Sequence, residues 1–256
     1  MRGAVVAAAV LVAGTAVGAP IPARDTAFVG VERGSVGVFA PLMWTVADGV
    51  EVRGHPLLFL VAPNAVVRVS HGEFGSVHIA GEYGLSVPTL GMRLARGYLF
   101  PSKSEIGWMA IPSVGLVASS GDPFANVWTA SADAAYRIRL SGPELGPLNA
   151  PAPLEMVFAP SAGGYRVRVG AGYDAAVGQA WRVRAYGDVF WFSAGELSPL
   201  ALRLGAAADR AVGRDSRFTF GAVYWNSDQG RRDPATGARL RSHDVLPTID
   251  FIYAWR

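Results

Sequence analysis

The chain contains no cysteine and a single lysine, Lys103, among its 256 residues. Without cysteine it can form neither disulfide bonds nor a thiolate metal site, and the mature N-terminus offers no attachment point for a lipid. Histidine is scarce as well, and the four residues of this type are His55, His71, His78 and His243. No two of them have the spacing of a metal-ligand pair on one strand, so we predict no metal and no cofactor.

Long apolar runs are missing after residue 23, where no uninterrupted stretch approaches the ~20 residues that a membrane helix needs. If this protein spans a membrane, it must therefore do so with strands. The formal charge is also small, +3 from 23 basic and 20 acidic residues, and the basic residues are spread along the chain. Such a distribution does not favour a nucleic-acid partner.

The N-terminus has the pattern of a signal peptide. Met1 and Arg2 precede the uncharged, apolar residues 3–18, and small residues at 16–19 suit a signal peptidase. We therefore predict a signal peptide at residues 1–19, with cleavage between residues 18 and 23. A membrane anchor is the weaker alternative, because the run is short and Pro20 and Pro22 follow it. Residues 24–256 contain no linker-like stretch and are predicted to form one domain.

Alternation with period two is the dominant signal in the second half of the chain. In the last strand, at residues 246–256, Ile249, Phe251, Tyr253 and Trp255 share one face, whereas Thr248, Asp250, Ile252 and Ala254 share the other. The same alternation occurs at residues 77–87, 126–140, 165–173, 181–188 and 217–225. Strands that are apolar on one face and small or polar on the other suit a wall between lipid and a wet interior.

This final strand resembles the closing strand of bacterial outer-membrane β-barrels, which usually ends in an aromatic residue that is recognised during insertion. Here the aromatic residue, Trp255, is penultimate and Arg256 follows it. The resemblance implies an all-β, antiparallel transmembrane barrel in the outer membrane of a Gram-negative bacterium. It also implies two kinds of partner, the outer-membrane lipids and the barrel-assembly machinery during insertion.

The number of strands follows from the remaining segments. Further strands are expected near residues 90–99, 106–118, 153–159 and 199–210. Two strands within residues 27–70 would make twelve in all, which we favour, and none would leave ten, since single-chain barrels usually have an even number. If both termini are periplasmic, the polar residues 227–244 form a long extracellular loop.

Charged side chains collect on the small or polar faces of these strands, and we predict that they face the lumen. The candidates are Arg137, Arg139, Arg166, Arg168, Arg182, Arg184, Arg203, Arg217, Glu82, Asp133, Asp188 and Asp250. An open lumen lined by arginine would favour anions. Alternatively, the arginines fill the interior in pairs with carboxylates, which we favour. The partners expected for them are Asp133, Glu155, Asp174, Asp188 and Asp250.

The remaining motifs do not predict an active site, and we assign no catalytic residue. Ser70 and His71 are neighbours and point to opposite faces of a strand, whereas His78 and Glu82 share a face ~13 Å apart. Aromatic residues near the strand ends are instead predicted to form interfacial girdles. They are Trp181, Trp191, Trp225, Trp255, Phe190, Phe192, Tyr224 and Tyr253.

Three hypotheses for function follow from these observations, and the oligomeric state is left open. The first is an outer-membrane barrel that acts as a narrow pore or has a structural role, and we favour it. The second is an outer-membrane lipid-modifying enzyme that uses His71 or His78. The third is a soluble periplasmic β-protein that binds an apolar ligand, which the mean hydropathy of +0.27 and the apolar faces at residues 106–118 would suit.

Overall fold

The computed structural model describes residues 20–60, 62–97, 105–143, 164–192 and 200–255. This part of the chain forms thirteen strands and two short helices, α1 (Pro56–Phe59) and α2 (Thr89–Leu94). Neither helix is long and apolar enough to cross a membrane. The strands are β1 (Gly34–Gly37), β2 (Leu42–Ala47), β3 (Val50–Gly54), β4 (Asn64–Phe74), β5 (Val77–Ser86), β6 (Trp108–Gly121), β7 (Asn126–Tyr136), β8 (Ile138–Ser141), β9 (Tyr165–Val177), β10 (Trp181–Phe192), β11 (Leu200–Ala211), β12 (Ser216–Arg232) and β13 (Arg239–Trp255).

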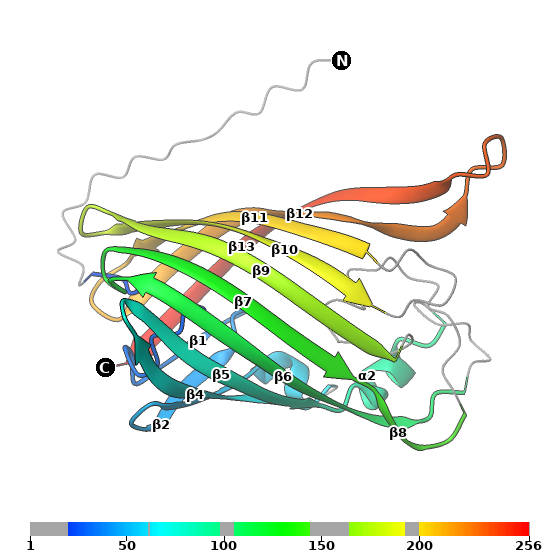
Figure 1. Ribbon diagram of the computed structural model, residues 1–256, viewed down its shortest axis with the longest axis horizontal. Helices are drawn as coiled ribbons and strands as arrows, with labels where there is room; N and C mark the ends of the chain where they lie inside the picture. Colours follow the sequence, from blue (N-terminus) through cyan, green and yellow to red (C-terminus); the bar gives the residue numbers. More distant parts are fainter. Residues whose placement is uncertain (1–19, 61, 98–104, 144–163, 193–199, 256) are drawn as a thin grey trace.

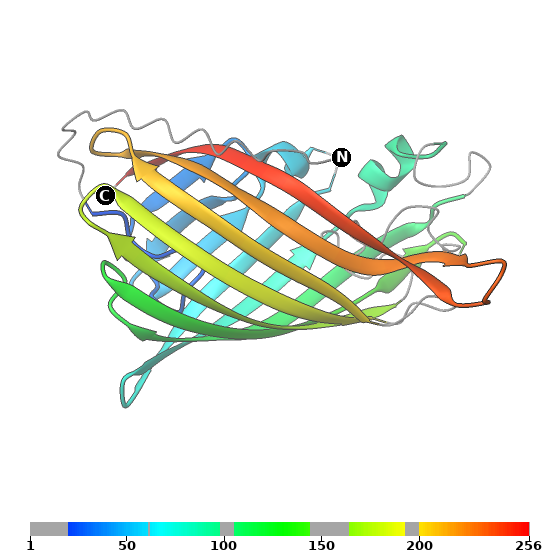
Figure 2. The same ribbon diagram turned by 90° about the horizontal axis from the view of Figure 1, so that it is seen from above.

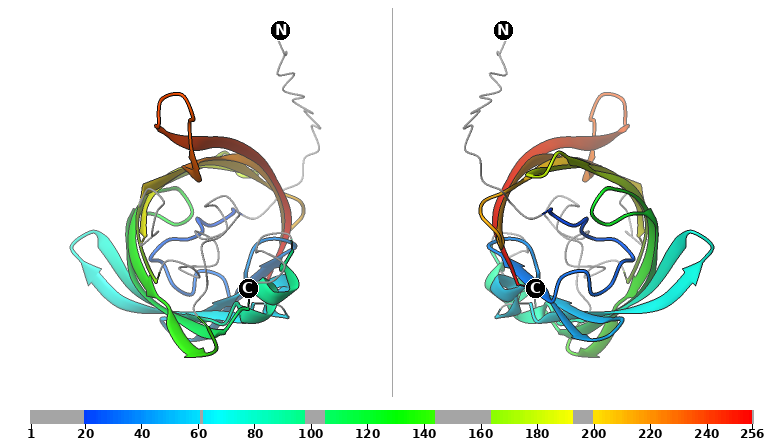
Figure 3. Two further views of the ribbon diagram at one scale, coloured as in Figure 1. Left: turned by 90° about the vertical axis from the view of Figure 1, so that its right-hand side faces the viewer. Right: turned by 90° about the vertical axis from the view of Figure 1, so that its left-hand side faces the viewer.

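Twelve of the described strands form a closed antiparallel barrel (Figures 1, 2 and 3). Each strand pairs with the next along the chain, except that β7 pairs directly with β9. The barrel closes where β1 pairs with β13, with Gly34 opposite Trp255. The thirteenth strand, β8, pairs with β6 only. The predicted fold class and the predicted count of twelve strands are therefore confirmed.

The barrel reaches this count by a different route from the one predicted. Residues 27–70 contain four strands rather than two, and three of these, β1 to β3, have only four to six residues. Pro41 and Pro56 lie outside these short strands, and Gly49, with φ of +70°, turns the chain between β2 and β3. The strand predicted at 153–159 lies outside the described residues.

The strand predicted at residues 90–99 is wrong, because helix α2 occupies its first part. Met92 of this helix is buried in a cluster with Ile106, Met109 and Ile111, and Ala95 packs against the same cluster. A separation of three residues between Met92 and Ala95 places both on one side of a helix. Packing against β6 therefore prevails over the strand pattern.

The single strand predicted at residues 126–140 is also wrong, because Arg137 separates two strands, β7 and β8. Tyr136 is opposite Tyr165, the first residue of β9, and the amide of Arg137 donates to the carbonyl of Gly164. The next residues leave β7 and form β8 against the start of β6. The wall of the barrel therefore keeps only β7 from this segment.

The long loop predicted at residues 227–244 is largely strand. β12 and β13 stay paired beyond Asn226 and project from the barrel as a hairpin (Figure 2). Ser227 and Ser242 hydrogen-bond through their hydroxyls at 3.0 Å, and six residues, 233–238, separate the strands. At this turn the carboxylate of Asp233 accepts backbone hydrogen bonds from Ala235 and Thr236, which lower its pKa.

The two faces of the wall differ as the alternation predicted. Large apolar side chains cover the outside, among them Leu116, Val169, Val183, Leu204, Phe218, Ile249, Phe251 and Tyr253. On the last strand Ile249 is 61% exposed, whereas Ile252 and Ala254, which point inward, are 1% and 7% exposed. Charged and small residues take the inner positions, and they form the candidate site.

Candidate functional site

An N-terminal stretch of the chain lies inside the barrel. Residues 20–33, here called the inner segment, enter from the end at which β13 terminates (Figures 1 and 3). Its buried residues are Ile21, Pro22, Ala23, Thr26, Ala27 and Glu32. The sequence analysis did not predict this segment, which has no period-two alternation. Residues 1–19, the predicted signal peptide, lie outside the described residues.

Hydrogen bonds from five strands or turns hold the inner segment against the wall. Arg182 Nη1 donates to the carbonyl of Ile21 at 2.8 Å, and the amide of Ala27 donates to Ser119 Oγ at 2.9 Å. The other anchors are the carbonyl of Pro123, which accepts from the amide of Ala23, the Arg68 guanidinium, which donates to the carbonyl of Thr26, and Arg217, which pairs with Glu32. The segment is therefore fixed at both ends and in its middle.

Asp25 of the inner segment has a positive φ, 57°, the one such value among the described residues other than glycine. Asp and Asn enter this left-handed region more readily than other side chains, although it is still unfavourable for them. Its carboxylate lies 3.0 Å from Arg53 Nη1 and 3.7 Å from Arg184 Nη1. The interactions with these two arginines help to hold the strained backbone.

A row of charged residues crosses the wall at the same level as this segment. Strand register places Glu51 opposite Arg68, Arg68 opposite Glu82, and, beyond Gly115 of β6, Asp133 opposite Arg168. Arg68 hydrogen-bonds Glu82, and Arg168 hydrogen-bonds Asp133. Charges of opposite sign on neighbouring strands thus neutralise one another inside the barrel.

Further pairs continue around the wall. Asp133 also accepts from Arg166, and Asp188 lies 2.6 Å from Arg203 Nη2 and 3.7 Å from Arg168 Nη1. Asp174 accepts from Arg182, whose side chain is almost fully buried. These contacts support the paired interpretation of the interior rather than the open one.

The sequence-predicted candidates do not all meet in this network. Arg166, Arg168, Arg182, Arg184, Arg203, Arg217, Glu82, Asp133 and Asp188 lie inside, in ion pairs with acidic or basic neighbours. Arg137 lies at the break between β7 and β8, and Arg139 is exposed on β8, outside the closed wall. Glu155, an expected partner, lies outside the described residues.

Asp250 has a different role from the predicted one. Its carboxylate accepts hydrogen bonds from three consecutive backbone amides, those of Val38, Phe39 and Ala40, at 2.8, 3.1 and 2.6 Å. These amides belong to the connection between the short strands β1 and β2, and that of Val38 also donates to the carbonyl of Phe251 at 3.3 Å. The predicted pairing of Asp250 with an arginine is replaced by a cap on this connection.

We expect Asp250→Ala to lower the free energy of unfolding by ~2 kcal/mol or more, because it removes charge-assisted hydrogen bonds to three amides. The measurement is the temperature at which the fast-migrating folded form in detergent converts to the slow one. Asp244→Ala, on the exposed part of the same strand, is the matched control. Equal transition temperatures for the two variants would contradict this role of Asp250.

Six charged residues were missed by the sequence analysis, five in the network and Arg24 beside it: Arg24, Asp25, Glu32, Glu51, Arg53 and Arg68. Glu51 and Arg53 alternate with Val50 and Val52 in β3, and Arg68 alternates with Val67 and Val69 in β4. Extending the period-two search to these short segments would have found three of the six. The other three belong to the inner segment, which shows no such pattern.

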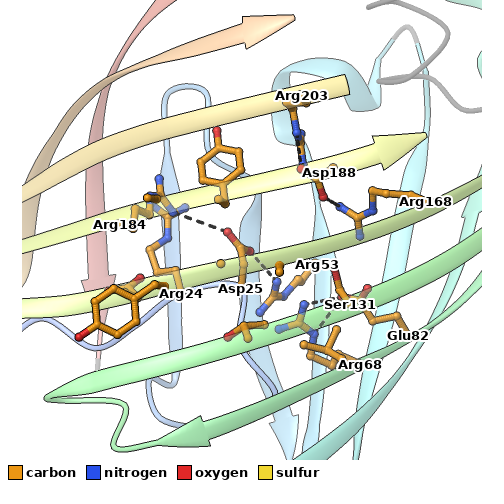
Figure 4. Close-up of a pocket in the computed structure, with 18 residues that line it drawn as sticks. Arg24, Asp25, Arg53, Arg68, Glu82, Ser131, Arg168, Arg184, Asp188 and Arg203 are labelled. Atoms are coloured by element: carbon orange, nitrogen blue, oxygen red, sulfur yellow. Dashed lines mark hydrogen bonds and ion pairs between the residues drawn. The ribbon is translucent and has the colours of Figure 1, made fainter. Parts of the chain in front are cut away.

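A cavity of about 390 Å³ lies between the inner segment and the wall (Figure 4). Its charged lining consists of Arg24, Arg53, Arg68, Arg168, Arg184, Arg203, Asp25, Glu82, Asp174 and Asp188. Six positive and four negative side chains leave an excess of positive charge around it. The uncharged lining includes Thr129, Ser131, Tyr173 and Tyr186.

Two aromatic residues assigned to the interfacial girdle face the interior instead. Phe190 and Trp225 are 2% and 6% exposed, and they pack with Ala201 and Val223. The guanidinium of Arg203 lies 5.7 Å and 5.5 Å from the centres of their rings. Girdle assignments for these two are therefore wrong, and their rings shield one side of an arginine that lines the cavity.

The histidines considered for an enzyme do not form a catalytic group with the predicted partner. Glu82 is held by Arg68, whereas His78 Nδ1 lies 3.2 Å from Glu73 Oε1 and its ring packs against Phe28. Within the described residues, no group of three or more His, Cys, Asp or Glu side chains is arranged to hold a metal.

Three solved structures that resemble this chain are of one outer-membrane protein. OmpT of Vibrio cholerae, expressed in the outer membrane, matches with a TM-score of 0.48 and 9% identity, over 84% of this chain and 64% of that one. Two forms of the same protein folded in vitro match with TM-scores of 0.47 and 0.46 at 9% and 10% identity. They cover 86% and 92% of this chain and 64% and 72% of their own, and the second is a trimer form. The chain thus spans a little under two thirds of the first two structures. No family model and no curated protein sequence matches it.

Proposed function

We propose that this protein is an outer-membrane barrel through which small anions pass slowly, in a lumen narrowed by the inner segment. The main support for this proposal is the contrast between the two faces of one closed wall. Large apolar side chains cover the outside and ion-paired charges fill the inside. A soluble protein rarely exposes an apolar surface that surrounds it, whereas a lipid bilayer requires one.

Strand length and connections support the same proposal. Strands β4 to β7 and β9 to β13 have ten to seventeen residues, enough to cross a bilayer at the usual tilt. Short turns join β4 to β5, β9 to β10 and β11 to β12 at the end where β13 terminates. In outer-membrane barrels the short turns are periplasmic. The inner segment would then close the periplasmic half, and the β12–β13 hairpin would project outside the cell.

The preference for anions follows from the cavity. Its six arginines outnumber its four carboxylates, and a narrow lumen with low-dielectric walls strengthens the field of the excess charge. The paired network fills much of the interior, so the conductance should be small. The second candidate is a barrel with a structural role and no transport. The ion-paired side chains that fill the interior also favour this candidate.

Planar-bilayer recording in a potassium chloride gradient tests this proposal. The purified chain should give small, stable channels whose reversal potential shows a preference for chloride over potassium. Asp25→Asn should increase this preference, because it removes one of four negative charges and keeps a side chain that accepts a positive φ. Asp233→Asn, in the hairpin turn, is the control and should change nothing. A preference for potassium would contradict the proposal, and complete absence of channels would favour the structural role.

A further inference from the structure

We propose that Arg24 of the inner segment and Arg184 of β10 form a binding site for a small oxyanion, a group such as phosphate or carboxylate. The site lies in the cavity of about 390 Å³ between the inner segment and the wall. Figure 4 shows both guanidinium groups at one side of this cavity, separated from the pairs that Arg168 and Arg203 form with Asp188. The site would deepen the anion preference proposed above, because it names the ligand and the residues that bind it.

The carboxylates of the lining all have arginine partners. Glu82 is held by Arg68 and Asp174 by Arg182, a residue behind the lining. Asp188 is shared by Arg168 and Arg203. Asp25 is closest to Arg53, at 3.0 Å. The negative charges are thus largely committed to other arginines.

Arg24 and Arg184 are the lining arginines with the weakest contacts to a carboxylate. Among the described residues, no hydrogen bond or ion pair joins Arg24 to another side chain, and the charged groups that act on it are Arg217, Arg184, Asp25 and Asp209. Arg184 reaches one carboxylate, that of Asp25, at the long distance of 3.7 Å. Its Nε is buried and has no hydrogen-bond partner in this part of the chain. Two guanidinium groups of like charge are therefore close together, and they have N–H groups available to bind a ligand.

Such a pair has a clear chemical preference. Like charges at short range raise the energy of the protein, and a bound anion relieves this repulsion. The planar guanidinium group presents parallel donors that match the two oxygens of a carboxylate or phosphate. Tyr186 and Ser131 add hydroxyl donors to the same lining. A halide offers one centre only and cannot use these donors in the same way.

The site also depends on the position of the inner segment. Arg24 is held between Ala23, whose amide bonds the carbonyl of Pro123, and Asp25, which bonds Arg53. Arg184, by contrast, belongs to the wall and is fixed by the register of β10 with β9. An oxyanion bound by both would therefore bridge the inner segment and the wall, and binding should stabilise the segment in its place.

Isothermal titration calorimetry on the full chain, folded in detergent at low ionic strength, tests the site directly. Inorganic phosphate should bind saturably, with chloride at the same ionic strength as the reference. Arg24→Gln and Arg184→Gln should each weaken the affinity about tenfold or more, since each removes charge-assisted hydrogen bonds. Arg210→Gln is the matched control, because Arg210 of β11 lies over Trp181 on the outer face. Titration with succinate in place of phosphate distinguishes a carboxylate ligand from a phosphate ligand.

Two results would overturn the site: no saturable binding of either oxyanion, or equal affinities for the Arg24→Gln and Arg210→Gln variants. If Arg184→Gln does not fold, Arg24→Gln decides the question alone, because Arg24 takes part in no ion pair of the network. The calorimetric result does not depend on transport. Binding without channels would overturn the proposed function and keep the site, whereas channels without binding would do the reverse.

Discussion

Deletion of residues 249–255 is expected to abolish assembly of the barrel completely. All four residues of β1, Gly34–Gly37, pair with residues 252–255 of β13, so β1 would lose its pairing with that strand. Residues 216–220 of β12 would also lose their pairs. Two strand edges would then face lipid with unpaired amides and carbonyls, each of which costs several kcal/mol there. Membrane fractionation with carbonate extraction and heat-modifiable migration in detergent should detect no folded, inserted species.

The matched control shortens the other end of the same hairpin. Replacing residues 233–238 by Asn-Gly removes residues that lie beyond the barrel and supplies a two-residue turn. This variant should assemble as the full chain does. Recovery of the chain without residues 249–255 as a folded membrane protein would contradict the requirement for closure at β1.

The wall was largely predictable because it separates two environments. At residues 165–173, 181–188 and 217–225, one face must suit lipid and the other must suit a charged interior. Successive residues face opposite sides, so the position of each residue in the strand determines which type of side chain it needs. In β10, for example, Val183 is exposed outside while Arg182 is buried inside. The short strands β1 to β3 lack this signal, since four to six residues give too few alternations to recognise.

Two features depended on contacts that no local pattern contains. Helix α2 is stabilised by the packing of Met92 against Met109 and Ile111 of β6, which are 17 and 19 positions later. Asp250 caps backbone amides that are about 210 residues away along the chain. Alternation placed the carboxylate of Asp250 on the correct face, but the nature of its partner could be found only from the closure of the barrel.

The inner segment was the largest omission, and its chemistry explains why. Its bonds to the wall mostly use backbone atoms, such as the carbonyl of Ile21 and the amides of Ala23 and Ala27. Backbone groups are present in every residue and therefore carry no sequence signal. The recognisable partners are on the wall. Arg68 and Arg182 pair with carboxylates of neighbouring strands and also donate to backbone carbonyls of the inner segment, whereas Arg217 pairs with Glu32 of the segment.

Truncation of the inner segment should raise the single-channel conductance several-fold. A chain that begins at Gly30, folded into detergent and compared with one that begins at Pro20, loses the residues that fill the lumen at the end where β13 terminates. It keeps Glu32 and therefore the ion pair with Arg217, so β1 should still be positioned. Arg182 retains Asp174, but Arg53 and Arg184 lose Asp25. The wider lumen should consequently prefer anions more strongly than the full chain does.

Addition of the missing residues as a free peptide distinguishes a filled lumen from a damaged one. A peptide of residues 20–29 should reduce the conductance of the truncated channel, because the carbonyl of Ile21, the amide of Ala27 and the carboxylate of Asp25 find their partners unchanged on the wall. A peptide of the same composition in scrambled order should have no such effect. Equal conductance of the two chains would show that the inner segment does not limit passage. If the native and the scrambled peptide reduced a large conductance equally, truncation would have distorted the wall instead.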